Sequence, residues 1–235
     1  KEFLLRSASI GAPNLPLVVL EPDKFEHRVK VSNLIFGCYI GIMLLMIAYN
    51  LVIYSNIKDP IYLIYVGYIF VSAIGLGVYH GFGYYLFPTE FQQLIHKHII
   101  TVNYLIAILL LWFAIKFLHI DRVKNLRSKI AKWYLLFLIA SLVLISWQIE
   151  YFAAKVFFGS QLILYGVAIY ILLPRLKTDY TWGRFYFLSW IPLMAGAGLQ
   201  SFMFLNVVDY SFIVRNCYLL AVLIEISFMA FALGE

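Results

Sequence analysis

Long stretches of this chain contain no Lys, Arg, Asp or Glu, and this feature constrains the fold more than any other. A helix needs about 20 apolar residues to cross the ~30 Å hydrocarbon core of a bilayer. The charge-free stretches that meet or approach this length are 31–57, 61–89, 99–115, 133–149, 156–174 and 185–208. A seventh apolar stretch, 210–233, is also long enough, but it carries Arg215 and Glu225.

The composition excludes a soluble protein. Hydrophobic residues make up 63% of the chain and charged residues 13%, against about 45–50% and about 25% in soluble domains. A soluble core of this size has no room for so much apolar surface. We therefore predict an all-α integral membrane protein, a seven-transmembrane helix bundle that occupies residues 31–235. The predicted spans are about 32–55, 60–82, 98–118, 133–150, 153–174, 184–206 and 211–233.

The orientation of the bundle is predicted from the basic residues near the span ends, which favour the cytoplasmic side. One set of loops carries only Lys97, Lys155 and Arg215. The richer set therefore faces the cytoplasm, which places the N-terminus outside and the C-terminus in the cytoplasm. This richer set consists of Lys58, Lys116, Arg122, Lys124, Arg127, Lys129, Lys132, Arg175, Lys177 and Arg184.

Residues 1–30 differ from the rest of the chain, with a β-branched run, prolines and mixed charges. This pattern predicts the last strand of an extracytoplasmic domain and a juxtamembrane connector. The chain starts at Lys1 without Met and stops at Glu235, directly after the last span. We therefore expect it to be a piece of a longer protein. The net charge of +6 fits inner-leaflet topology rather than nucleic-acid binding.

Several polar residues fall in the outer half or at the outer rim of the predicted spans, where they are candidates for function. They come from five spans, so an outward-facing ligand pocket is one interpretation. The other is a set of hydrogen bonds between helices, each worth about 0.6 kcal/mol. The residues are His80, Asn103, Gln148, Glu150, Gln161 and Gln200.

Glu225 is the one carboxylate deep within a predicted span. An unpaired ionised carboxylate at this depth costs several kcal/mol, so Glu225 is expected to be protonated or partnered. Asn50 lies in the inner half of the first span and is the candidate partner. The pair serves either as a structural contact between helices or as a signalling switch.

The two cysteines, Cys38 and Cys217, both fall within predicted spans. Two buried thiols are one interpretation. A disulfide between the first and seventh spans is the other, because both residues lie near the outer surface.

Small residues predict where helices contact one another. Gly37 and Gly41 form a GxxxG motif in the first span. The AGAG segment at 195–198 and the pair Gly159 and Gly166 are expected to act in the same way.

The chain lacks the motifs of common catalytic sites. It contains no HExxH, no Gly-rich phosphate loop and no GxSxG. His96 and His98 are two residues apart and lie on different faces of a helix, which disfavours joint metal binding. We therefore expect no cofactor, no metal and no enzymatic activity.

The region 37–88 resembles the start of the membrane unit of bacterial seven-transmembrane receptors with diverse intracellular signalling modules. The family pattern contains a Gly, a Met…Tyr-Asn segment, a short turn with Asp, and a Tyr-rich second span that ends in Gly and Leu-x-Pro. The matching residues are Gly41, Met46, Tyr49, Asn50, Tyr54, Asp59, Tyr62, Tyr65, Gly81 and Pro88.

The resemblance implies a sensor and transducer in the bacterial inner membrane. An outer β-sandwich domain that binds carbohydrate-like or other small ligands would precede the spans, and a kinase, cyclase or phosphatase module would follow them. Membrane lipid, an unknown small-molecule ligand and a second copy of the chain are the expected partners. The alternative function is a small-solute transporter or channel, which would need a polar path through the inner half.

Overall fold

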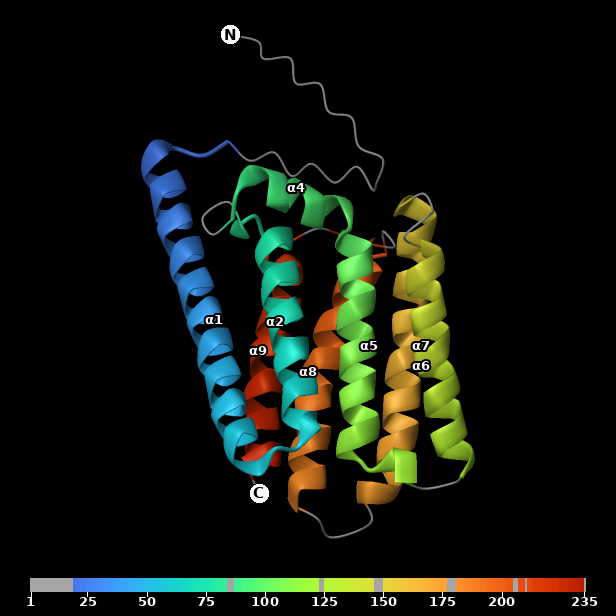
Figure 1. Ribbon diagram of the computed structural model, residues 1–235. Helices are drawn as coiled ribbons and strands as arrows, with labels where there is room; N and C mark the ends of the chain where they lie inside the picture. Colours follow the sequence, from blue (N-terminus) through green and yellow to red (C-terminus); the bar gives the residue numbers. More distant parts are fainter. Residues whose placement is uncertain are drawn as a thin grey trace.

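The computed structural model shows an up-and-down bundle of long helices (Figure 1). They are α1 (Pro22–Ile57), α2 (Pro60–Tyr79), α5 (Ile99–Phe117), α6 (Leu126–Ile145), α7 (Glu150–Leu176), α8 (Thr181–Phe204) and α9 (Phe212–Gly234). A short helix α4 (Thr89–Lys97) and a 3₁₀ turn η1 (Ile120–Arg122) lie in the connections. The residues that the structure describes are 19–83, 87–122, 125–145, 150–176, 181–204, 207–209 and 211–234.

The predicted all-helical class is confirmed for the described residues. Among the residues that the structure describes, five helical segments are long and apolar enough to cross a membrane. They are Pro22–Ile57, Pro60–Tyr79, Ile99–Phe117, Val156–Leu173 and Ile213–Ala230. The long helices agree with the predicted spans to within a few residues at most ends, because uninterrupted apolar sequence is a strong helix signal in membranes.

Helix α1 starts about ten residues earlier than the predicted first span, so residues 22–31 are helical. Pro22 at its first position and Asp23 in its first turn favour a helix start. Lys24 pairs with Glu21 at 2.8 Å and Lys30 with Glu26 at 3.7 Å, at spacings that support helices. With 36 residues, α1 is about 54 Å long and exceeds a ~30 Å bilayer core.

The turn between α1 and α2 is as short as predicted. Lys58 adopts a left-handed conformation with φ 60, and its N–H donates to the carbonyl of Tyr54. The Asp59 side chain accepts a hydrogen bond of 2.9 Å from the N–H of Ile61. Pro60 occupies the first turn of α2, where its missing N–H costs nothing. These local contacts reverse the chain within two residues.

Helix α4 lies in the connection between the predicted spans 60–82 and 98–118, where no helix is predicted. It lies across one end of the bundle, over the ends of α2 and α5 (Figure 1). Gln92 of α4 is 2% exposed, and a Cβ on Gly83 would lie 2.9 Å from its side-chain oxygen. We call this end of the bundle the α4 end and the opposite end the C-terminal end.

Helices α8 and α9 approach each other closely at Gly196. A Cβ at this position would lie 2.6 Å from the Cβ of Ala221 and 3.1 Å from the carbonyl oxygen of Cys217. The prediction that the AGAG segment contacts a helix is therefore confirmed at Gly196. Backbones approach this closely only where a side chain is absent.

The other predicted glycine contacts are not formed among the described residues. A Cβ at any of Gly37, Gly41, Gly159 and Gly166 would meet no heavy atom of the described residues within 4 Å. The GxxxG motif lies on an exposed face of α1, and spacing alone does not say which face of a helix is covered.

The predicted alternative of a disulfide is also wrong, because both cysteines are free thiols. Cys38 is exposed on α1. The thiol of Cys217 lies 2.9 Å from the carbonyl oxygen of Val214 on its own helix.

Candidate functional site

The most deeply buried carboxylate among the described residues is Glu225 of α9, which is 0% exposed. Its Oε2 accepts a hydrogen bond of 2.9 Å from the hydroxyl of Tyr68 on α2. Its Oε1 has no partner among the described residues. A buried carboxyl oxygen without a hydrogen-bond donor is costly.

Tyrosines surround this carboxylate on three helices. Tyr65 of α2, Tyr186 of α8 and Tyr218 of α9 lie within electrostatic range of the Glu225 carboxyl group. We call Glu225 with Tyr65, Tyr68, Tyr186 and Tyr218 the Glu225 cluster. Tyr65 and Tyr186 are buried and their hydroxyls have no partner among the described residues. The cluster therefore holds unused hydrogen-bonding groups in the middle of the bundle.

The predicted hydrogen bond between Asn50 and Glu225 is not formed. Asn50 is fully buried, as its polar position in an apolar run suggested. Its Nδ2 donates instead to the carbonyl of Met46 at 2.8 Å, which is a common bond of Asn to the preceding helical turn. Its Oδ1 has no partner among the described residues. Tyr68 takes the place that Asn50 was expected to fill.

Helix α2 is hydrogen-bonded to α1 and to α9 through tyrosine hydroxyls. The hydroxyl of Tyr62 donates to the carbonyl of Leu233 on α9 at 3.3 Å, close to the C-terminal end. The hydroxyl of Tyr39 on α1 donates to the carbonyl of Ser72 at 3.2 Å. Together with the bond from Tyr68, the contact at Tyr62 couples α9 to α2 at two levels of the bundle.

A second polar feature lies at the α4 end, where a cavity of about 270 Å³ opens between α1, the end of α2 and the start of α9. We call it the α4-end pocket. Its polar lining consists of Arg28, Ser32, His80, Arg215 and Asn216, and its apolar lining of Phe25, Val29 and Phe82.

His80 is the most buried polar residue of the pocket lining, at 8% exposed. It follows directly after α2, whose C-cap it forms. Its Nε2 has no hydrogen-bond partner among the described residues. Burial, together with the nearby Arg215 guanidinium, lowers the pKa of His80 to about 4. The imidazole is therefore neutral at pH 7, and its Nε2 can either donate or accept one hydrogen bond.

Phe82 forms one wall of the pocket and is held in place by Phe36 of α1. The two rings stack with their centroids 4.0 Å apart and an interplanar angle of 11°. Such stacking fixes the ring orientation, so this wall is preformed.

Among the described side chains, the predicted ligand residues Asn103, Gln161 and Gln200 do not line this pocket. Asn103 of α5 and Gln161 of α7 are partly buried, and Gln200 of α8 is buried at 9% exposed. Gln148 lies outside the described residues, and Glu150 begins α7 with its side chain outside them. That these residues form one ligand pocket with His80 stays a prediction.

Several residues of both sites were missed from the sequence. Tyrosines are abundant in this chain, 18 in all, so nothing marked Tyr68 as the partner of Glu225. Arg215 was noted as a charge within the last span, and this signal could have indicated a polar site. Arg28 was read as part of a connector, because the helical continuation of α1 was not recognised.

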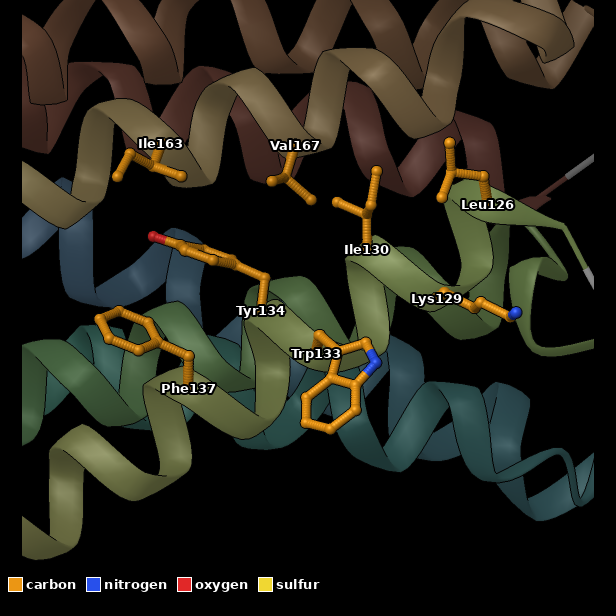
Figure 2. A pocket seen from close by; sticks show the side chains of 8 residues that line it. All are labelled: Leu126, Lys129, Ile130, Trp133, Tyr134, Phe137, Ile163 and Val167. Atoms are coloured by element: carbon orange, nitrogen blue, oxygen red, sulfur yellow. The ribbon is translucent and has the colours of Figure 1, made fainter.

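An apolar cavity of about 520 Å³ lies between α6 and α7. Figure 2 shows Ile130 of α6 facing Val167 of α7, with Lys129 toward one end and Phe137 toward the other. Its lining is almost entirely hydrophobic, so it fits an acyl chain and not a polar ligand. It is separate in composition and position from the two polar sites.

The apolar helices and the buried polar cluster define an integral membrane helix bundle. Residues 32–235 match the family described as 7TM diverse intracellular signalling, and the chain belongs to this family. The sequence resemblance is thereby confirmed. No curated protein and no solved structure matches the chain.

Proposed function

We propose that the chain is the membrane sensor and transducer domain of a bacterial receptor. It would relay a signal from the extracytoplasmic side to a kinase, cyclase or phosphatase module in the cytoplasm. The family description, which names intracellular signalling, supports this role. The excess of Lys and Arg in one set of the loops between spans supports a cytoplasmic C-terminus and an α4 end on the outer side. The proposed location is the bacterial inner membrane, which is where such a receptor would act.

The observation that carries the proposal is the hydrogen bond between Tyr68 and Glu225. It links the last helix to α2 in the centre of the bundle, and the second carboxyl oxygen of Glu225 has no partner among the described residues. A small shift or rotation of α9 would give the Glu225 carboxyl group different hydrogen-bond partners. Two packings that differ by such an exchange are what a receptor needs to convert a ligand signal into motion of its last helix.

The variant Glu225→Gln tests this role. The glutamine side chain keeps the shape of the original and one acceptor for Tyr68, but it cannot ionise and it adds an amide that needs acceptors. We expect the ratio of the two packings to shift, and the basal output of the complete receptor to change by about fivefold or more. The output is measured as the activity of the attached module in membranes at equal expression.

The matched control is Glu90→Gln, which removes an exposed carboxylate on α4 and is expected to leave the output unchanged. Equal output from wild type and Glu225→Gln would show that Glu225 is a structural contact and not a switch.

We further propose that a lipid acyl chain of the surrounding membrane fills the apolar cavity between α6 and α7. Its hydrophobic lining and the Lys129 side chain at one end suit an anionic phospholipid. A homodimer would use the exposed GxxxG face of α1, since small residues allow close approach of helices.

A further inference from the structure

The α4-end pocket combines positive charge with a buried, unused hydrogen-bonding group. Arg28 and Arg215 bring two guanidinium groups to the cavity from α1 and α9. None of its described lining residues is acidic.

His80 supplies a second, independent indication of a ligand. The side chain is more than nine-tenths buried and lines the cavity, and its Nε2 has no partner among the described residues. Buried polar atoms in proteins are nearly always hydrogen-bonded, and an exception calls for an explanation. A bound group that accepts a hydrogen bond from Nε2 would satisfy this atom.

The chemistry of the lining selects the class of ligand. Guanidinium groups present a planar fork of donors that matches carboxylate and phosphate oxygens. Ser32 and Asn216 add neutral hydrogen-bonding groups, while Phe25 and Phe82 offer an apolar wall. The cavity of about 270 Å³ is slightly smaller than typical pockets for drug-sized ligands.

We propose that the α4-end pocket binds a small oxyanion, a carboxylate or phosphate group, between Arg28 of α1 and Arg215 of α9, with His80 as a buried donor. The bound anion would draw the start of α9 toward α1. Since α9 also carries Glu225, occupancy of the pocket would bias the packing of the Glu225 cluster. This last step rests on the proposed function, whereas the binding itself does not.

Binding is tested on the purified chain in nanodiscs of phosphatidylcholine. Inorganic phosphate and succinate are titrated separately at constant ionic strength, and Kd is obtained from the shift in Tm. At least one of the two is expected to raise Tm in a saturable way. Arg28→Gln and Arg215→Gln are each expected to raise Kd by about tenfold or more, because each removes charged hydrogen-bond donors.

Two further variants test whether the anion binds in the pocket or is attracted only by the positive charge of the surrounding surface. Lys97→Gln removes an exposed positive charge at the same end of the bundle without touching the pocket, and it is expected to leave Kd unchanged. His80→Phe keeps the aromatic contact with Phe82 but removes the buried nitrogen. It is expected to weaken binding while Tm without ligand stays equal or rises.

A second series distinguishes the source of the anion. If soluble anions have no effect but nanodiscs with phosphatidylglycerol raise Tm, and the arginine variants abolish this rise, the ligand is a lipid phosphate. The proposal is overturned if neither soluble anions nor phosphatidylglycerol stabilise the chain, or if Lys97→Gln weakens binding as much as the arginine variants. A failure of binding leaves the signalling role of Glu225 standing, because that role is measured separately through the output.

Discussion

Gly196→Ala lowers the free energy of unfolding by about 1–3 kcal/mol, the range for overpacking a close contact. The added Cβ would lie 2.6 Å from the Cβ of Ala221, 3.1 Å from the carbonyl oxygen of Cys217 and 3.2 Å from the Cα of Tyr218. Two of these atoms belong to the backbone of α9, so no side-chain rotation can move them away. The helices must therefore separate, and Gly196→Leu is expected to prevent assembly of a stable bundle.

The matched control is Gly198→Ala, two residues further along the same helix. A Cβ there meets no atom of the described residues within 4 Å. Alanine is a better helix former than glycine by about 1 kcal/mol, so this variant is expected to be as stable as wild type or more stable. Both variants gain the same helix propensity, and the difference between them isolates the contact with α9.

Unfolding is measured by heating and by denaturant titration in the same detergent. The double variant Gly196→Ala with Ala221→Gly removes the closest contact and is expected to regain part of the lost stability. The two backbone contacts remain, so recovery is incomplete. If Gly196→Ala and Gly198→Ala have equal effects, the close approach of α8 and α9 at Gly196 is not present in the folded protein.

The approximate position of the long helices could be predicted from the sequence, because every span needs about 20 apolar residues to cross the hydrocarbon core. A segment such as Pro60–Tyr79 can cross the hydrocarbon core only as a helix, because its backbone N–H and C=O groups find no water there. The beginning of α1 could not be predicted in the same way. Residues 22–31 carry mixed charges, and their helix depends on a proline start and on ion pairs, which are weaker signals.

The depth of a polar residue could also be predicted, but not its neighbours. Glu225 and Asn50 are both fully buried, as their surroundings in the sequence indicated. Which side chains meet depends on the rotation of each helix and on which helices are adjacent. These properties arise from packing over the whole bundle, and so Asn50 was matched with Glu225 on depth alone. Gly37 and Gly41 illustrate the same point: their GxxxG spacing is visible in the sequence, but the sequence does not show that this face of α1 is exposed.

The α4-end pocket brings together residues that are far apart in the chain. Arg28, His80 and Arg215 come from three different helices or their ends. Each was visible as a charge or an imidazole near a span end, but the sequence offered no reason to group them. Their grouping depends on the extension of α1 beyond the predicted span, which carries Arg28 to the mouth of the cavity.

Tyr68→Phe is expected to lower the free energy of unfolding by about 1–2 kcal/mol, since it leaves the carboxyl group of Glu225 without a hydrogen-bond donor among the described residues. The ring stays in place, so packing is unchanged and the loss reports on the hydroxyl alone. Tyr65→Phe is the matched control. Tyr65 is buried on the same helix, but its hydroxyl has no partner among the described residues, so its removal is expected to be neutral or stabilising.

The decisive measurement is the effect of Tyr68→Phe when residue 225 can no longer accept a hydrogen bond. In the Glu225→Leu background the Tyr68 hydroxyl is itself a buried group without its partner, and removing it is expected to be neutral or stabilising. Replacing both members of a buried polar pair by apolar groups is often tolerated, whereas removing one member is not. The double-mutant cycle should thus show a coupling of about 1 kcal/mol or more. A coupling near zero would mean that the two side chains do not interact in the membrane. Since the switch proposed for α9 depends on this bond, Tyr68→Phe would then also leave the output of the receptor unchanged.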